Sequence, residues 1–340
     1  MRNMIGNTPL LEIVYTYKGE ERKIFAKAEF FNLTGSIKDR MAKHIIEESY
    51  KDGSLKPGMP IIEATSGNTG IALSALGALY GHPVHIFMAD WMTQERKHMI
   101  NKYGATLHDV TVEQGGFIGS VDLANKLAEE IGGFRPQQFI NPYNVDAHYK
   151  STGLEIIAQL KNRKVTPHGF VAGVGTGGTI MGVRKRLLEF FPELKVFPLE
   201  PHKAPAMSAG KMGGDHRIQG IGDGFIPEIV KPDILDDVVV VHDGDSIIMA
   251  QKLAEELGLG VGISSGANFI GSVMIQNKYG KDFNPITIFS DDSKKYLTSD
   301  LLRKEPIEEG YLSSDIELIS VDGSCICDKE TKALLKKYNS

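Results

Sequence analysis

Apolar residues follow two patterns that alternate along the chain. Short continuous runs, such as 60–64 and 84–88, are typical of strands buried on both faces of a parallel sheet. Other segments carry apolar residues three or four positions apart, as at Ile37, Met41 and Ile45, and this spacing predicts helices. The repeated order of strand, glycine turn and helix predicts βαβ units with helices on both faces of each sheet.

The predicted elements form two series that meet near residue 142. A hairpin opens the chain, a glycine-rich irregular segment interrupts the second series at 203–227, and a peripheral tail or small cap is expected over 304–340. The expected strands are 8–17, 22–29, 60–64, 84–88, 106–110, 137–140, 168–173, 195–200, 236–242 and 286–290, and the expected helices include 93–103, 118–132, 146–162, 245–257 and 267–278.

A chain of 340 residues is longer than most single cores, so two lobes are expected. The fold class predicted is α/β, with two three-layer αβα lobes, each built around a mostly parallel twisted sheet. In such folds a ligand binds at the carboxyl ends of the strands, which places the expected site in the cleft between the lobes.

Composition describes an ordinary globular protein, with 41% apolar and 24% charged residues. The net charge of −5 offers no basic footprint for nucleic acid or an anionic membrane. No apolar run approaches the roughly 20 residues that cross a bilayer, and the start lacks a signal-peptide core, so a cytoplasmic location is expected. The two cysteines, Cys325 and Cys327, are expected to be plain thiols, because zinc sites normally need four ligands.

Lys38 is the first candidate for chemistry. It follows a glycine turn and Ser36, with Asp39 three residues after that serine, as in a capping box. A lysine among the unpaired N–H groups of a helix start is disfavoured as an ammonium and is therefore more readily a neutral amine. Such an amine forms a Schiff base with pyridoxal phosphate; the alternative is an ordinary solvated lysine.

Three strand-to-helix loops could hold a ligand. Residues 175–179 form a phosphate cup without the lysine of a Walker A loop, and the alternative is a structural glycine turn. Residues 65–70 carry hydroxyls and an amide that suit a carboxylate, or else cap a helix. In 262–266, the Ser264 hydroxyl can hydrogen-bond a pyridine nitrogen without forcing it to protonate, which suits chemistry at a β-carbon.

These loops and the lysine, in this order, resemble the cysteine synthase family of fold-type II pyridoxal-phosphate enzymes. The resemblance covers roughly residues 4–300 and depends on six ordered motifs, which are GNTPL at 6–10, GSIKDR at 35–40, TSGNTG at 65–70, GVGTGGT at 173–179, GIGDGFIP at 220–227 and GISSG at 262–266.

The resemblance implies a role for each matching residue. Lys38 would form the Schiff base with pyridoxal 5'-phosphate and later exchange the proton at the substrate α-carbon. Asn68 would contact the ring hydroxyl of the cofactor, and Ser264 its pyridine nitrogen. The cofactor phosphate would lie on Gly175, Thr176, Gly177, Gly178 and Thr179, and the substrate carboxylate on Thr65, Ser66, Thr69 and Gln138.

The resemblance also implies a separate function for each lobe. Residues 36–145 would form a small mobile substrate-binding lobe, and residues 1–35 with 146–303 a large lobe that binds the cofactor. Family members are usually homodimers. The dehydratase branch typically has His where Thr69 stands, so this loop favours the synthase branch.

Asp223 departs from the family pattern, since cysteine synthases generally place a small residue there. A carboxylate partly desolvated in a closed pocket has a raised pKa and can act as a base near neutrality. It would repel hydrosulfide but activate water, which predicts conversion of L-cysteine and water to L-serine and hydrogen sulfide. The alternative for Asp223 is an outward-facing turn residue.

Three other functions stay open at this point. An O-acetylserine sulfhydrylase, which is a cysteine synthase, would make cysteine from O-acetylserine and sulfide. An enzyme of the same chemistry could condense cysteine with another thiol or amine. A protein of another class, a non-catalytic cysteine-synthase-like regulatory binding protein, would not need the Schiff-base amine of Lys38.

Overall fold

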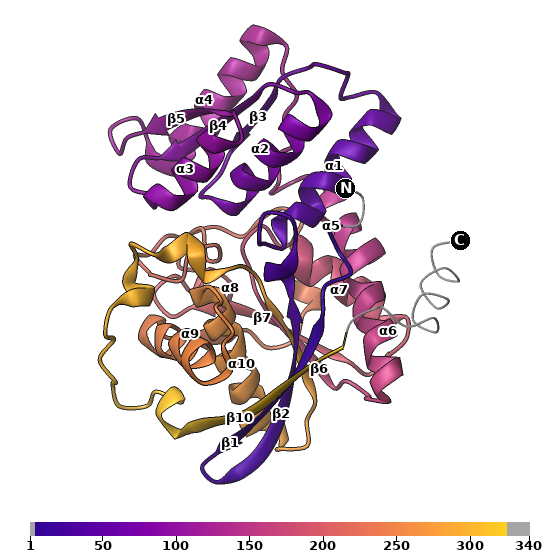
Figure 1. The fold of residues 1–340 in the computed structure, drawn as a ribbon, viewed down its shortest axis with the longest axis vertical. Coiled ribbons are helices and arrows are strands. Elements are labelled where there is room, and N and C mark those ends of the chain that lie inside the picture. Colours follow the sequence, from indigo (N-terminus) through magenta and orange to yellow (C-terminus); the bar gives the residue numbers. More distant parts are fainter. Residues whose placement is uncertain (1–3, 325–340) are drawn as a thin grey trace.

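The computed structural model describes residues 4–324, which form two sheets with helices packed on both faces (Figure 1). The α/β fold class predicted from the sequence is confirmed. The strands are β1 Leu10–Tyr17, β2 Glu20–Ala28, β3 Ile61–Ala64, β4 Val84–Ala89, β5 Thr106–Val110, β6 Gly169–Gly173, β7 Lys195–Pro201, β8 Val239–Val241, β9 Pro285–Phe289 and β10 Ile316–Ser324. The helices are α1 Lys38–Asp52, α2 Asn68–Tyr80, α3 Gln94–Lys102, α4 Gly116–Ile131, α5 Pro142–Ala147, α6 Gly153–Arg163, α7 Gly178–Leu188, α8 Ala206–Ala209, α9 Asp243–Leu257 and α10 Ile263–Tyr279.

The smaller sheet contains β3, β4 and β5, all parallel. Strands β3 and β4 are buried on both faces, and their neighbouring side chains point to opposite sides of the sheet. Ile61 packs in a core with residues of α1 and α2, whereas Ile62 packs in a second core with Ala124 and Ala128 of α4. This explains why β3 appears in the sequence as a continuous apolar run and not as an alternating one.

The larger sheet has the order β10-β1-β2-β9-β6-β7-β8. Strands β2, β9, β6, β7 and β8 run parallel, while β1 pairs antiparallel with both of its neighbours. Phe170 of β6 lies in a core with α6 and α7, and its neighbour Val171 lies in a core with α9 and α10. The carboxyl ends of the parallel strands point toward the smaller sheet (Figure 1).

Three predicted elements differ from the structure. Residues 137–140 form a turn and not a strand, because Gln137 has a φ of +52° and pairing stops at the single bridge between Phe134 and Ile61. The helix predicted at 146–162 is divided into α5, a π-helical turn at His148–Thr152, and α6. Helix α10 begins at Ile263, so Ser264 lies in its first turn and not in a loop.

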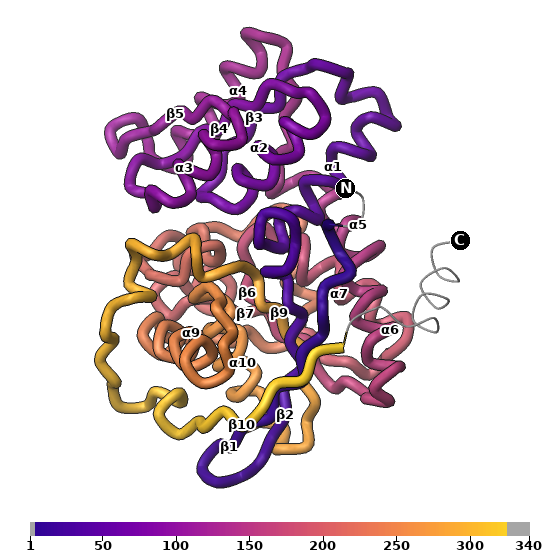
Figure 2. Tube along the Cα trace, viewed as in Figure 1, coloured from indigo at the N-terminus to yellow at the C-terminus, as the bar shows by residue number. Residues whose placement is uncertain are grey.

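The end of the described chain also differs from the prediction. Residues Ile316–Ser324 form β10 and pair with β1 along the edge of the larger sheet, where a peripheral tail or cap was expected (Figure 2). Cys325 and Cys327 lie outside the described residues. In the described part, no helix is both long and apolar enough to cross a membrane. The division into lobes at 36–145, 1–35 with 146–303, and 304–340 stays a prediction.

A buried ion cluster joins α1 to the larger sheet. The Arg40 guanidinium contacts Glu29 (Nε to Oε2, 2.6 Å) and Glu155 of α6 (Nη1 to Oε1, 2.7 Å). Lys27 of β2 reaches Glu155 with its Nζ 2.8 Å from Oε2. Burial alone would raise the pKa of Glu155, but Arg40 and Lys27 hold that pKa well below its ordinary value. All four side chains are buried, so each depends on the others for its polar contacts.

Replacing Glu155 with Gln should lower the free energy of unfolding by about 3 kcal/mol, because the change leaves two buried cations with one carboxylate. Urea unfolding followed by circular dichroism measures the loss. The control is Lys23→Met, which removes a half-exposed ion pair of 2.8 Å with Glu12 and should cost less than about 1 kcal/mol. Equal losses of unfolding free energy in the two variants would show that the buried cluster stabilises the fold no more than an exposed ion pair does, which would contradict this prediction.

Candidate active site

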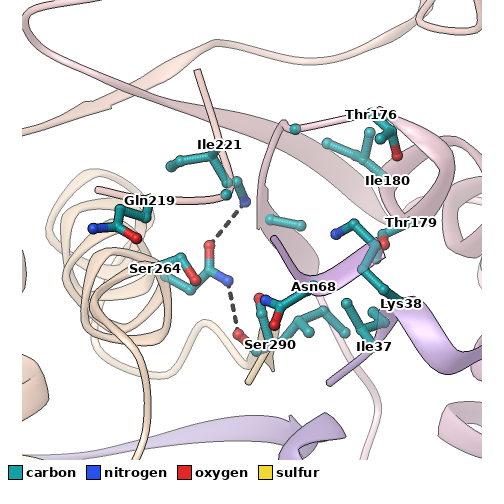
Figure 3. Close-up of a pocket in the computed structure, with 17 residues that line it drawn as sticks. Ile37, Lys38, Asn68, Thr176, Thr179, Ile180, Gln219, Ile221, Ser264 and Ser290 are labelled. Atoms are coloured by element: carbon teal, nitrogen blue, oxygen red, sulfur yellow. Dashed lines mark hydrogen bonds between the residues drawn. The ribbon is translucent and has the colours of Figure 1, made fainter. Parts of the chain in front are cut away.

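A cavity of about 540 Å³ opens at the carboxyl ends of the parallel strands. Lys38 enters it from the start of α1, Asn68 from the start of α2, and Ser264 from the first turn of α10 (Figure 3). The glycine-rich loop between β6 and α7 forms another wall, with Gly175, Thr176, Gly177 and Thr179 along it. Gly178 begins α7 directly behind this loop. The structure therefore brings together the lysine and the loops that the sequence separates widely.

The first turn of α1 is held by Thr34 and not by the predicted capping box. The Asp39 carboxylate accepts hydrogen bonds from the backbone N–H of Thr34 at 2.6 Å and from its hydroxyl. Ser36 accepts only a long hydrogen bond, 3.3 Å, from the N–H of Lys38. Asp39 thus reaches back five residues, across the Gly35 turn, and fixes the loop that places Lys38.

Lys38 has a pKa below its ordinary value. Burial is the main cause, and the nearby Arg96 guanidinium adds to it, while the carboxylates of Asp291 and Asp223 oppose it. The position of Lys38 at a helix start predicts a neutral amine from the helix dipole, whereas in the structure desolvation is the largest cause of the lowered pKa. The direction is the same, and a larger share of Lys38 is a reactive neutral amine than in water.

The predicted substrate residues line a second cavity of about 370 Å³ that also contains Lys38. The Thr69 hydroxyl donates to Gln138 Oε1 at 2.6 Å, and Gln138 Nε2 donates to the carbonyl of Ala64 at 3.1 Å. The side-chain amide of Asn144 then donates both to the Gln138 carbonyl at 2.8 Å and to the Thr176 hydroxyl at 2.9 Å. Thr65 and Ser66 complete this wall.

Asp223 faces the same second cavity as Lys38. Burial raises the pKa of its carboxyl group, although the charges of Lys38 and His216 work in the opposite direction. The His216 ring nitrogen Nε2 lies 2.9 Å from the carbonyl oxygen of Gly222, next to Asp223 in the chain. Asp223 is therefore not an outward-facing turn residue.

Comparison with known proteins shows the family of the chain. The family model described as a pyridoxal-phosphate dependent enzyme matches residues 1–291. The chain belongs to this family. Cysteine synthase B of Campylobacter jejuni is 40% identical over 299 residues, which cover 88% of this chain and 96% of that protein. Cysteine synthase of Staphylococcus aureus is 36% identical over 298 residues, covering 88% and 95%.

Solved structures of similar enzymes have the same fold. The crystal structure of a hydrogen sulfide-producing enzyme from Fusobacterium nucleatum is 53% identical, covers 95% of this chain and 97% of its own, and superposes with a TM-score of 0.93. A second structure of a hydrogen sulfide-producing enzyme, an aspartate-to-asparagine mutant in complex with an α-aminoacrylate intermediate, is 54% identical, covers 94% and 96%, and has a TM-score of 0.92.

The residues present fit pyridoxal phosphate, on which this family depends. Loop 175–179 requires glycine at three positions. A Cβ on Gly175 would lie 2.4 Å from the Gly220 carbonyl oxygen, and one on Gly178 would lie 2.0 Å from Asn144 Oδ1. Gly177 has a φ of +86°, and a Cβ there would lie 2.2 Å from Val230. The loop thus presents bare backbone at a helix start, as a phosphate requires. Asn68 Oδ1 is buried and has no partner among the described residues, so it is available to a ligand.

Sequence reasoning missed four residues close to these cavities, namely Arg96, Gln219, Asp291 and Tyr296. Arg96 comes from α3 and lines the second cavity, and Gln219 lines the first. Asp291 and Tyr296 are buried just behind the first cavity. Only Asp291 had a signal in the sequence, because it follows a predicted strand at its carboxyl end, where functional residues of parallel sheets gather.

Lys38 should be the lysine that holds the cofactor. Borohydride reduction of the loaded enzyme, followed by peptide mapping, is expected to find the pyridoxyl group on Lys38. The internal control is Lys295, a second buried lysine with a lowered pKa, whose Nζ donates to the Gly35 carbonyl at 2.9 Å. Pyridoxyl label on Lys295 in place of Lys38 would contradict the assignment.

Asp39 should make stability depend on pH. Burial raises the pKa of its carboxyl group to about 6, against an ordinary value of 3.8, so the folded state binds this proton more tightly than the unfolded state. Its contribution is complete below pH 3.8 and is lost as pH rises through 6. Between pH 5 and 7 the unfolding free energy of the parent, relative to Asp39→Asn, should fall by about 1 kcal/mol. A difference that stays constant in urea titrations would refute this.

Proposed function

We propose that this enzyme converts L-cysteine and water to L-serine and hydrogen sulfide. The family and its pyridoxal-phosphate chemistry are shown by the comparisons, which support replacement at the β-carbon of an amino acid. The observation that carries the finer proposal is that Asp223 and Lys38 line one cavity together with the predicted carboxylate loop. We infer that an amino acid bound in this cavity would lie between these two acid–base groups.

Six residues of this cavity have a role in the proposed reaction, namely Lys38, Thr65, Ser66, Thr69, Gln138 and Asp223. Thr65, Ser66 and Thr69 hold the substrate carboxylate, with Gln138 fixing the Thr69 hydroxyl. Bound pyridoxal phosphate supplies an electron sink that weakens the bonds at the substrate α-carbon. Lys38, as a neutral amine, removes the α-proton, and the bond between the β-carbon and sulfur breaks as hydrosulfide departs.

Asp223 acts in the second half of the reaction. Its carboxylate takes a proton from water while the water oxygen bonds to the β-carbon, and Lys38 returns its proton to the α-carbon. Asp223 passes this proton to solvent, where it balances the hydrosulfide released in the first half, so that L-cysteine and water give L-serine and hydrogen sulfide. Because its pKa is raised, Asp223 is a stronger base than an exposed aspartate, and its charge repels hydrosulfide from re-entering.

The similar structures support this choice. The similar Fusobacterium nucleatum enzyme produces hydrogen sulfide, and its aspartate-to-asparagine mutant holds an α-aminoacrylate intermediate. We propose that Asp223 is the corresponding aspartate in this chain. The O-acetylserine sulfhydrylase reaction is the second candidate, and it is favoured by the named cysteine synthases among the relatives.

Replacing Asp223 with Asn should abolish serine formation from cysteine while the first release of sulfide continues. Serine is measured by chromatography and sulfide by a methylene blue assay, with a single turnover resolved by stopped flow. The control is Asp215→Asn, an exposed aspartate in the same irregular segment, which should leave both products unchanged. Unchanged serine output from the Asp223 variant would overturn the proposal, and cysteine formation from O-acetylserine and sulfide at a higher rate than serine formation would establish the second candidate.

The oligomeric state and the cellular location stay predictions. We propose a homodimer, as is usual in the family, and a cytoplasmic location. The small amino-acid substrate is supported by the family, whose named members are cysteine synthases.

A further inference from the structure

The carboxylate of Asp291 lies buried between two hydrogen-bond donors beside the cofactor cavity. It directly follows β9, and its side chain is 1% exposed. Asn68 Nδ2 and the Tyr296 hydroxyl both donate to its Oδ2 atom, each at 2.7 Å. The sequence motifs that predict the cofactor site contain Asn68. They contain neither Asp291, which accepts its hydrogen bond, nor Tyr296, which holds Asp291.

This contact fixes the orientation of the Asn68 amide. The Asp291 Oδ2 atom accepts a hydrogen bond from the NH₂ end of the amide, so the amide oxygen points elsewhere. One hydrogen of Nδ2 is used by Asp291, and Oδ1 has no partner within residues 4–324. Asn68 therefore points into the cavity with Lys38 as a pre-oriented donor and acceptor (Figure 3).

Tyr296 is also linked, through Arg96, to the predicted substrate loop at residues 65–70. The Arg96 guanidinium lies over the Tyr296 ring, 4.9 Å from its centroid, and Nη1 donates to the carbonyl of Ser66 at 3.3 Å and to the Gln219 side chain. Gly67 packs directly on this arginine, since a Cβ there would lie 2.5 Å from Arg96 Cδ. A continuous set of contacts thus joins the predicted carboxylate loop, through Arg96, Tyr296 and Asp291, to Asn68.

We propose that Asp291 and Tyr296 are positioning residues for the cofactor ring, which act by holding Asn68, and that Arg96 couples this arrangement to the substrate loop. The proposal rests on the pyridoxal-phosphate dependence of the family and on the expected contact between Asn68 and the ring. It does not depend on which nucleophile enters, so its failure and the failure of water activation by Asp223 are separate results.

Electrostatics adds a second consequence. The Asp291 carboxylate lies close enough to Lys38 to raise the pKa of that lysine, against the larger effect of burial. Other charges near Lys38 come from Asp223 in the irregular segment and Arg96 in α3. Removing the Asp291 charge while keeping its shape should therefore shift the titration of Lys38 to lower pH.

The test uses Tyr296→Phe, which removes one buried hydroxyl, and Asp291→Asn, which removes one charge. The matched control is Tyr143→Phe, because the Tyr143 hydroxyl also donates to an aspartate, Asp52, at 2.8 Å but outside the site. After cofactor removal, pyridoxal phosphate is titrated back and followed by quenching of the single tryptophan, Trp91. Tyr296→Phe should weaken cofactor binding about tenfold, and the control should not change it.

A pH profile separates positioning from mere stability. Reductive methylation of Lys38 in the cofactor-free enzyme, measured by mass spectrometry between pH 6 and 10, should show a lower apparent pKa in Asp291→Asn than in the parent or in Tyr143→Phe. Parental cofactor affinity in Tyr296→Phe, or an unchanged Lys38 profile in Asp291→Asn, would overturn the proposal. If Asp291→Asn does not fold, the affinity of Tyr296→Phe decides the question.

Discussion

The buried ion cluster around Arg40 is the constraint on which the site depends. Arg40 follows Lys38 by two residues, and its partners come from the end of β2 and from α6. A buried guanidinium cannot exchange its carboxylates for water, so the first turn of α1 has one position relative to the larger sheet. Lys38 is thereby fixed opposite the glycine loop, although most of α1 packs with the smaller sheet.

Two carboxylates, those of Asp223 and Asp291, lie close to Lys38 but differ in their surroundings. Both stabilise positive charge on Lys38, and burial outweighs both. The Oδ2 atom of Asp291 accepts two hydrogen bonds, in line with the proposed positioning role, whereas Asp223 has a raised pKa and lines the second cavity. Asn144 adds a link of another kind, since it bonds both Gln138 and Thr176 and so connects the substrate wall to the phosphate loop.

The sequence predicted those parts of the site that are contiguous in the chain. Lys38, loop 175–179 and Ser264 each lie at a strand-to-helix transition, where glycines, hydroxyls and apolar spacing mark the local structure. The contacts of Arg96 and Tyr296 depend on packing between residues about 200 positions apart, which no local pattern encodes. Gln137 shows the opposite case, because its positive φ ends a strand that the neighbouring residues favour.

The position of β10 has a consequence for the order of assembly. The smaller sheet is complete once residues 61–110 exist, and its contacts are local. The larger sheet places β10, the last described strand, against β1, the first, about 300 residues earlier in the chain. Contacts between distant segments form slowly because a long loop must close first. During synthesis β1 therefore has a free edge until β10 has been made, which makes β1 a segment that depends on protection from aggregation.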